Sequence, residues 1–172
     1  MFEALSNLFG DKAPSLDGFT MGFCQFSWEF TKDEIMTFFG DFFRLGAFQR
    51  SLNSTFLILI PKKEGTERVK DFRPISLVGS LYKLLAKVLE NRLKLVVGEV
   101  VSKFQYAFIQ DRQIMDVALI ANEAIDSKFK DNFFGLLLKL DIEKTFDHVN
   151  WDCLLSIMSK MGFEQRWINL HS

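Results

Sequence analysis

The sequence predicts an α+β fold, because segments with helical periodicity alternate with shorter β-prone segments. Apolar residues recur three and four positions apart, as on one face of a helix, in residues 31–46, 80–97, 114–130 and 150–162. Aliphatic and β-branched side chains dominate residues 55–60 and 136–140, and the more polar residues 70–77 could form the second arm of a hairpin with the first of these. We therefore expect a β-hairpin and one further buried strand, packed on several amphipathic helices.

The composition indicates one globular domain. Of the 172 residues, 48% are hydrophobic and 25% are charged, as in a folded chain with a real core. The 20 phenylalanines exceed what a chain of this length needs, and we expect most of them in that core. The net charge of −1 argues against a uniformly basic nucleic-acid binder, so contact with phosphates would require a local basic cluster.

The sequence shows no membrane or targeting segment. Its longest wholly apolar runs, such as residues 56–60, are far shorter than the roughly 20 residues that cross a bilayer. No basic region precedes a long apolar stretch at the N-terminus, so no secretory signal is expected. Cys24 and Cys153 form neither a metal-binding pattern nor a disulfide framework. These features favour an intracellular protein of the nucleus or cytoplasm.

Residues 31–46 are predicted to form an amphipathic helix. Thr31 and Glu34 have the spacing of a capping box, and Gly46 is placed to end the helix. The preceding residues 11–23 are rich in Gly, Pro and Ser and are expected to form a loop. The apolar face of the helix is expected to point to the core, and it consists of Ile35, Phe38, Phe39, Phe42 and Phe43.

The β-prone residues 55–60 and 70–77 are expected to pair as a hairpin across a polar turn. Pro74 holds the residue before it, Arg73, in an extended conformation. A guanidinium suits bidentate binding of phosphate, but from the residues alone a surface ion pair with Asp71 is the favoured role of Arg73. The hairpin carries five basic and three acidic residues: Lys62, Lys63, Arg68, Lys70, Arg73, Glu64, Glu67 and Asp71.

Three further helices have recognisable ends. Ser80 begins the clearest of them, and Gly98 is predicted to close it. A second helix begins at Ile114, with Val117, Ala118, Ala121, Ala124 and Ile125 expected to face inward. A third is capped by Asn150 and ended by Gly162, and its inward side is expected to consist of Leu154, Leu155, Met158 and Met161.

The apolar residues 136–140, interrupted only by Lys139, are predicted to form a buried strand that presents Asp141 at its end. A carboxylate in that position can bind a hard cation such as Mg2+. An aspartate leaving a strand is also typical of a turn or a helix cap. From position alone the turn or cap is the more common role, and both remain open.

Several stretches resemble the reverse transcriptases of non-LTR retrotransposons of the plant long-interspersed type. Residues 139–149 read Lys-Leu-Asp-Ile-Glu-Lys-Thr-Phe-Asp-His-Val and are similar to the first catalytic motif of that family, with Thr145 in place of the usual Ala. Residues 11–19 have Ser15 and Leu16 where the family has Gly-Pro, and Asp111 stands where Gly is usual. The other similar stretches are residues 59–63, 71–78, 80–93 and 104–114.

The resemblance implies part of a right-hand polymerase fold. Residues 1–51 would form an N-terminal extension with the Phe-rich helix, and residues 52–172 a truncated reverse transcriptase domain. Within that domain, residues 52–130 would be the fingers and residues 131–172 the start of the palm.

The resemblance also implies roles for individual residues. Asp141 would be the catalytic metal ligand, together with the backbone carbonyl of Ile142. Arg73 would bind the triphosphate of the incoming nucleotide, and Phe146 would exclude a 2′-hydroxyl. The residues implied in nucleotide binding are Lys62, Lys63, Arg73 and Phe146, and those implied in template or primer binding are Gln105, Arg112 and Gln113.

The implied cofactor of the complete enzyme is Mg2+ or Mn2+, with weak or no binding by this chain. Its implied partners are an RNA template, a DNA primer, deoxynucleoside triphosphates and the remainder of the palm from a longer chain, with no membrane. Two-metal catalysis needs further carboxylates, which the family supplies in an Asp-Asp hairpin, and the sequence contains no Asp-Asp pair. We therefore expect the chain alone to be inactive. The alternative is a non-catalytic retroelement remnant that binds protein or nucleic acid.

Overall fold

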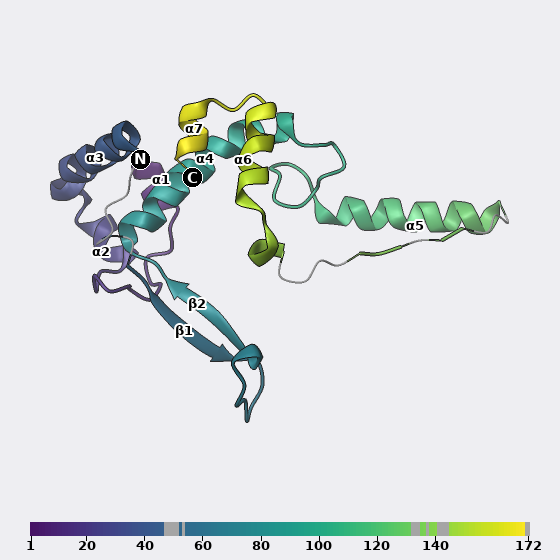
Figure 1. Cartoon of the computed structure of the whole chain (residues 1–172), viewed down its shortest axis with the longest axis horizontal. Coiled ribbons are helices and arrows are strands. Elements are labelled where there is room, and N and C mark those ends of the chain that lie inside the picture. Colours follow the sequence, from purple (N-terminus) through teal and green to yellow (C-terminus); the bar gives the residue numbers. More distant parts are fainter. Residues whose placement is uncertain (47–51, 53, 132–134, 137, 141–144, 171–172) are drawn as a thin grey trace. The chain divides into compact units, whose positions relative to one another are not determined.

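The computed structural model describes residues 1–46, 52, 54–131, 135–136, 138–140 and 145–170 (Figure 1). The chain divides into two compact units, Met1–Arg92 and Leu93–Ser172. The first contains three N-terminal helices, a two-stranded antiparallel sheet and the beginning of helix α4. The second contains the end of α4 and the helices that follow it. The predicted combination of helices with a small antiparallel sheet is therefore confirmed.

Three helices begin the first unit: α1 (Phe2–Ser6), α2 (Met21–Phe26) and α3 (Trp28–Leu45). Helix α2 packs against both of the others. The Gln25 side-chain amide donates hydrogen bonds to the carbonyls of Leu5 (3.0 Å) and Leu8 (2.8 Å), at and beyond the end of α1. It thereby joins α2 to the end of α1. The buried apolar side chains of these helices include Leu5, Met21, Phe39 and Phe42.

Two predicted boundaries in this region are wrong. The predicted loop ends at Thr20, which caps α2 by accepting a hydrogen bond from the Phe23 N–H (3.2 Å). Helix α3 begins at Trp28, before the predicted capping box. The Thr31 hydroxyl instead donates to the Ser27 carbonyl (3.0 Å), which is the bond of a threonine inside a helix. The predicted end at Gly46 is confirmed, with φ of +68°.

The predicted hairpin is formed by β1 (Phe56–Pro61) and β2 (Phe72–Leu77), which are antiparallel. Every residue of β1 is exposed, as are the four central residues of β2. The expectation that these strands pack on helices is therefore wrong. Because a two-stranded sheet buries little by itself, such a hairpin is marginally stable without support from other elements.

The prolines of the hairpin fit its hydrogen-bond pattern. Bonded and non-bonded residue pairs alternate along an antiparallel ladder. The Lys62 N–H donates to the Asp71 carbonyl (2.9 Å), just beyond the last strand pair. Counting back from this bond, Pro61 and Pro74 both lie in non-bonded pairs, where the ladder needs no N–H. Arg73 pairs with Ile60, in the bonded pair that lies between these two non-bonded pairs.

Helix α4 (Ser80–Val100) follows β2 and buries Leu84 and Leu85. The predicted end at Gly98 is wrong, because the helix continues to Val100. A glycine inside a helix costs only about 1 kcal/mol relative to alanine. The Gly98 carbonyl also accepts a hydrogen bond from the Arg112 side chain (3.0 Å), which supports the backbone there.

The second unit contains α5 (Ile114–Lys130), the short 3-10 helix η3 (Thr145–His148), α6 (Trp151–Lys160) and α7 (Gln165–Asn169). Asn150 caps α6 as predicted, since its Oδ1 accepts from the Cys153 N–H (2.9 Å). The predicted end at Gly162 is also confirmed, with φ of +91°. The Phe163 N–H there donates to the Met158 carbonyl (3.2 Å), as in a Schellman motif.

The predicted strand at residues 136–140 is not formed by its described residues. The side chains expected to be buried are open to solvent, with Leu136 92%, Leu138 69% and Leu140 79% exposed. A strand is stable only when a neighbour pairs with its backbone groups. In the described part of the chain, the sheet consists of β1 and β2. Asp141 and Ile142, which this strand is predicted to present, lie outside the described residues.

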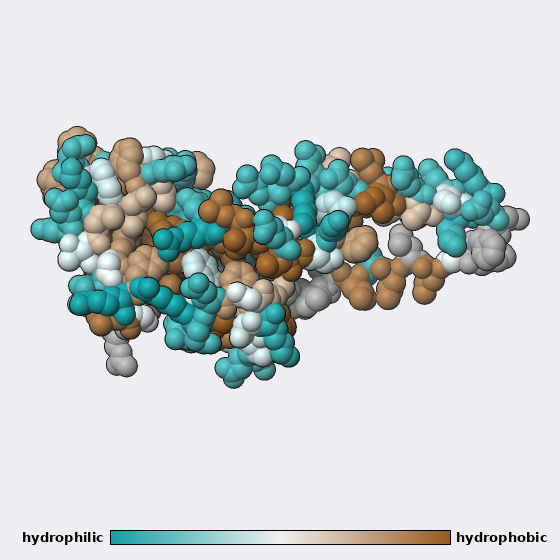
Figure 2. Space-filling model, turned by 90° about the horizontal axis from the view of Figure 1, so that it is seen from above, coloured by the Kyte–Doolittle hydropathy of each residue, from teal (hydrophilic) through white to brown (hydrophobic). Residues whose placement is uncertain are grey.

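The predicted core faces of α5 and α6 are wrong as well, since neither helix has a buried residue. Figure 2 shows hydrophobic side chains interspersed with hydrophilic ones along the surface of α5, on the right of the view. Among the described phenylalanines only Phe39 and Phe42 are buried, so most are not core residues. The cause is the same in each case: no second apolar layer covers these side chains within the described structure. None of the described helices is both long and apolar enough to cross a bilayer.

Candidate functional site

The tip of the hairpin is held by two hydrogen bonds that involve predicted nucleotide-binding residues. The chain turns after β1 and enters β2 through the short 3-10 helix η2 (Val69–Asp71). The Lys62 ammonium donates to the Lys70 carbonyl across the turn (2.9 Å). The Thr66 hydroxyl donates to the Lys63 carbonyl (2.5 Å). The turn is therefore an ordered structure, which fixes the backbone positions from which its charged side chains extend.

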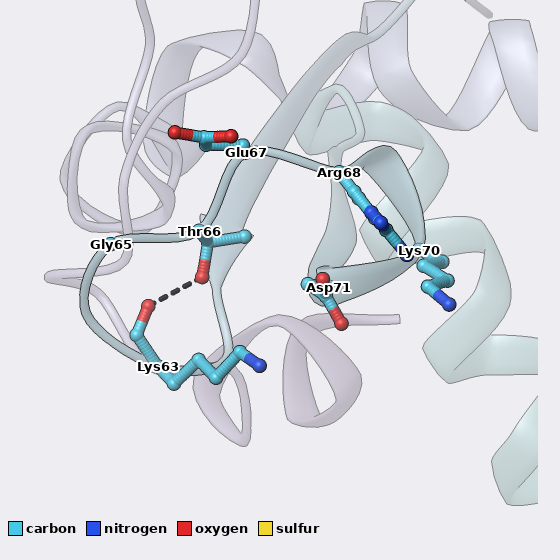
Figure 3. A pocket seen from close by; sticks show the side chains of 7 residues that line it. All are labelled: Lys63, Gly65, Thr66, Glu67, Arg68, Lys70 and Asp71. Atoms are coloured by element: carbon cyan, nitrogen blue, oxygen red, sulfur yellow. Dashed lines mark hydrogen bonds between the residues drawn. The ribbon is translucent and has the colours of Figure 1, made fainter.

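An open hollow of about 310 Å³ lies at this tip (Figure 3). In Figure 3 the Glu67 carboxylate points away from Arg68 and Lys70. The lining contains three basic and two acidic side chains, so it favours an anion over a cation. It is formed by Lys63, Gly65, Thr66, Glu67, Arg68, Lys70 and Asp71.

Lys62 and Arg73 lie on one face of the hairpin. Ile60 is the cross-strand partner of Arg73, and side chains two residues apart along an extended ladder share a face. Lys62 lies one residue beyond β1, and its N–H continues the ladder by donating to the Asp71 carbonyl. Lys62 is therefore the diagonal neighbour of Arg73. Arg73 is exposed, and its guanidinium has no hydrogen bond or ion pair with any described residue. The ion pair with Asp71 favoured from the residues alone is thus not formed.

The guanidinium of Arg112 binds the backbone at the end of α4. Its Nη1 donates to the carbonyls of Ser102 (2.8 Å) and Gln105 (2.7 Å), and its Nη2 donates to that of Gly98 (3.0 Å). Gly98 is among the last four residues of α4, whose carbonyls the helix leaves unpaired. Arg112 therefore ties the helix end to the loop that follows. Its role on template or primer stays a prediction.

The loop between α4 and α5 contains two residues with positive φ. Asp111 has φ of +63°, a conformation that favours glycine and that aspartate tolerates better than most residues. Phe108 has φ of +64°, and its side chain is 99% exposed. The Gln105 side chain donates to the Ala107 carbonyl (3.2 Å). Gln113 precedes α5 at the N-cap position, without a side-chain cap bond.

Phe146 lies in η3 and is 75% exposed. Its ring meets that of Trp151 edge-on, with the centroids 5.7 Å apart and the planes at 76°. The predicted metal ligands, Asp141 and the Ile142 carbonyl, lie outside the described residues. Within the described ranges, no three His, Cys, Asp or Glu side chains are grouped so as to hold a metal ion.

The two cysteines are both free thiols. Burial raises the pKa of the Cys24 thiol, and a hydrogen bond with the Ser80 side chain partly opposes this. The thiol therefore stays protonated near neutral pH and is a poor nucleophile. Cys24 is accordingly a packing residue of α2.

The sequence comparisons identify the family. A profile described as "Reverse transcriptase (RNA-dependent DNA polymerase)" matches residues 60–171, which is more than half of the chain. The chain belongs to the reverse transcriptase family. The match begins in β1 and includes β2, α4 and the helices described after it. The chain is thus a fragment of a reverse transcriptase domain, related to those of non-LTR retrotransposons.

Three relatives illustrate this relationship. The chain is 30% identical to the "Transposon TX1 uncharacterized 149 kDa protein" of Xenopus laevis over 166 residues, which are 96% of the chain and 13% of that protein. It is 31% identical to the "RNA-directed DNA polymerase from mobile element jockey" of Drosophila funebris over 120 residues (67% and 13%). It is 26% identical to the Pol polyprotein of the retrotransposable element R2 of Popillia japonica over 107 residues (62% and 15%). The chain therefore spans only a small part of each relative.

Sequence reasoning missed the side chains that join the N-terminal segment of this reverse transcriptase fragment to α4. Ser15 and Ser80 are both buried, and Asp17 accepts a hydrogen bond from the Ser80 N–H (3.3 Å). The Asp17-Gly18 pair is a turn signal, but nothing in it indicates a partner 63 residues away. The contributions of Arg68 and Lys70 to the hollow were missed as well.

The bonds of Arg112 predict a stability effect. Replacing Arg112 with Gln should lower the free energy of unfolding by about 2 kcal/mol, because three carbonyls lose a charged donor. Urea denaturation followed by circular dichroism measures this change. Lys103→Gln is the matched control, because Lys103 is an exposed cation in the same loop and should change stability by less than about 0.5 kcal/mol. Equal losses in the two variants would contradict the assigned role.

Proposed function

We propose that this chain is the fingers and the first palm segment of an enzyme that extends a DNA primer on an RNA template. The observation that carries the proposal is the exposed cationic face of the hairpin, where Arg73 lies beside Lys62 and close to the tip at Lys63. Phosphate oxygens accept charge-assisted hydrogen bonds from guanidinium and ammonium groups. In the proposal, Arg73 binds the triphosphate of the incoming deoxynucleotide, and the two lysines assist.

The proposal assigns the catalytic carboxylate to Asp141 and a further metal contact to the Ile142 backbone carbonyl. Carboxylate and carbonyl oxygens are the donors that Mg2+ or Mn2+ prefers, so this donor set fits the ion. When bound, two such ions stabilise the attacking and leaving oxygens of phosphoryl transfer. Phe146, which follows Asp141 closely in the sequence and has an exposed ring, would exclude a 2′-hydroxyl from the nucleotide site.

The loop between α4 and α5 is the proposed contact for template and primer, through Gln105, Arg112 and Gln113. Arg112 uses three of its five N–H donors on backbone carbonyls, which leaves two for a phosphate oxygen. The proposed domain division is an extension at 1–51, fingers at 52–130 and the start of the palm at 131–172. The remainder of the palm would come from a longer chain. The amino-acid sequence of the motif at residues 139–149 supports an origin of the chain in a retrotransposon of the plant long-interspersed type.

Binding of a nucleoside triphosphate tests the role of Arg73. A fluorescently labelled deoxynucleoside triphosphate titrated with the chain should bind at least about tenfold more weakly to Arg73→Gln, because a charged donor to phosphate is lost. The matched control is Arg44→Gln, since Arg44 is an exposed arginine of α3 in the same unit. The proposal fails if both variants bind like the unaltered chain, or if both lose affinity equally.

Primer extension tests the predicted inactivity of the isolated chain. With a primed RNA template, Mg2+ and all four deoxynucleotides, we expect no extended product on a sequencing gel. The physical reason is that a single strand-end carboxylate cannot hold two metal ions, and the 172 residues contain no Asp-Asp pair. A template-dependent product that disappears with Asp141→Asn would show that the chain itself supplies a complete site.

A second function, that of a non-catalytic binding module, is favoured by the exposed surface of α5. No residue of this helix is buried, and its exposed apolar side chains include Ile114 (69%), Met115 (68%) and Leu119 (59%). Exposed apolar side chains in this number mark either an interaction site or a face normally covered by more of the same protein.

The α5 surface predicts self-association of the isolated chain. Sedimentation velocity should show oligomers that increase with concentration, because association removes apolar area from water. Replacing Leu119 and Ile120 with Ser should reduce association at least about threefold, whereas Leu45→Ser, at an exposed leucine of α3, should not. A monomeric chain at every concentration would argue against the binding module.

A further inference from the structure

The hairpin needs a support that its own strands do not provide. Both faces of β1 and β2 are exposed, and the sheet has two strands in the described structure. Such a hairpin is marginally stable alone. A phosphate-binding arm, however, has to hold Arg73 in a defined position, because misplaced donors lose binding energy. The base of the hairpin, where β2 leads into α4, is the point at which the described structure holds it.

Residues 13–20, here called the N-terminal strap, run across this base and bind it at several points. The Ser15 hydroxyl donates to the carbonyl of Leu77, the last residue of β2. Asp17 Oδ2 accepts from the Ser80 N–H (3.3 Å), and the Ser80 hydroxyl donates to the Phe19 carbonyl (2.9 Å). A further, longer bond runs from Lys83 Nζ to the Ala13 carbonyl (3.4 Å).

The strap has a conformation suited to these bonds. The Gly18 N–H donates to the Ser15 carbonyl (3.0 Å), which closes a turn. Gly18 has φ of +70°, where a side chain would be strained. Asp17 Oδ1 accepts from the Phe19 N–H (3.2 Å), so the carboxylate is fixed by its own turn while its other oxygen reaches Ser80. The turn itself thus orients the carboxylate toward α4.

Asp17 acts on α4 as a capping side chain from a distant part of the chain. The first N–H groups of a helix have no partner within the helix. A carboxylate at this end accepts a hydrogen bond from one of them, and its negative charge interacts favourably with the helix dipole. Ser80 is the first residue of α4 and is buried, as are Gly79 and Ser15. The bonds of Ser15 and Ser80 therefore lie at a part-buried junction, although Asp17 itself is exposed.

We propose that the N-terminal strap positions the hairpin for nucleotide binding, with Ser15 and Asp17 as its positioning residues. The strap precedes residues 60–171, the part that matches the reverse transcriptase profile. It fixes the last residue of β2 and the first residue of α4, and Arg73 lies four residues before that fixed end. The link to nucleotide binding rests on the proposed function of the hairpin, whereas the effect of the strap on hairpin order does not.

Hydrogen exchange on the full 172-residue chain tests the strap directly. The variants are Asp17→Ala, Ser15→Ala and Asp17→Asn, which keeps an acceptor oxygen. Asp11→Ala is the matched control, because Asp11 is an exposed carboxylate near the strap with no bond to a described residue. The reporters are the amides of Ile58, Ile60, Arg73 and Ile75, which lie in bonded pairs of the ladder, and the Phe39 amide of α3 serves as reference.

Asp17→Ala and Ser15→Ala should each lower the protection of the hairpin amides about fivefold, while the protection of the Phe39 amide changes by less than about twofold. In Asp17→Asn and Asp11→Ala, the protection of the hairpin amides should stay within about twofold of that in the unaltered chain. Equal loss at Phe39 would mean general destabilisation of the unit and would overturn the proposal, as would unchanged hairpin protection.

A titration with the labelled triphosphate completes the test. Asp17→Ala should weaken triphosphate binding by about the same factor as it lowers hairpin protection, and Asp17→Asn should restore it. Lost protection with unchanged triphosphate affinity would overturn the positioning role. If the unaltered chain binds no triphosphate, the proposed function fails, and hydrogen exchange alone then decides whether the strap orders the hairpin.

Discussion

The junction between β2 and α4 is the constraint on which the first unit depends. A two-stranded sheet with both faces in water has no core of its own, so its direction is set where the chain leaves it. At that point Ser15 binds the end of the strand and Asp17 binds the start of the helix. Both contacts satisfy backbone groups, which is why short polar side chains serve better there than apolar ones.

The second unit uses the same physical solution at the other end of α4. Helix ends leave carbonyls unpaired, and the Arg112 guanidinium collects one of these together with two from the following loop. Asp111, the residue before this arginine, has a left-handed backbone conformation. Arg112 therefore has a structural task in this chain, which is distinct from its proposed contact with template or primer.

The large exposed apolar surface agrees with the small share of each relative that the chain represents. A folded domain buries the apolar faces of its helices against further layers of secondary structure. Here α5 and α6 have no buried residue, and the leucines before Asp141 are open to solvent. Exposing these apolar side chains to water is unfavourable. We therefore expect the isolated chain to bury them against another surface, either more of its own protein or another copy of the chain.

The sequence by itself determined the hairpin, the cap at Asn150 and the helix ends at Gly46 and Gly162, because these depend on local backbone preferences and short-range hydrogen bonds. The motifs also identified, without any structure, a reverse transcriptase domain related to those of non-LTR retrotransposons.

Tertiary structure alone decided the partners of Asp17 and Arg112, since a local pattern cannot name a backbone group far along the chain. It also decided that residues 136–140 do not form a strand in their described part, because a strand exists only when another strand pairs with it, and apolar sequence cannot supply that partner.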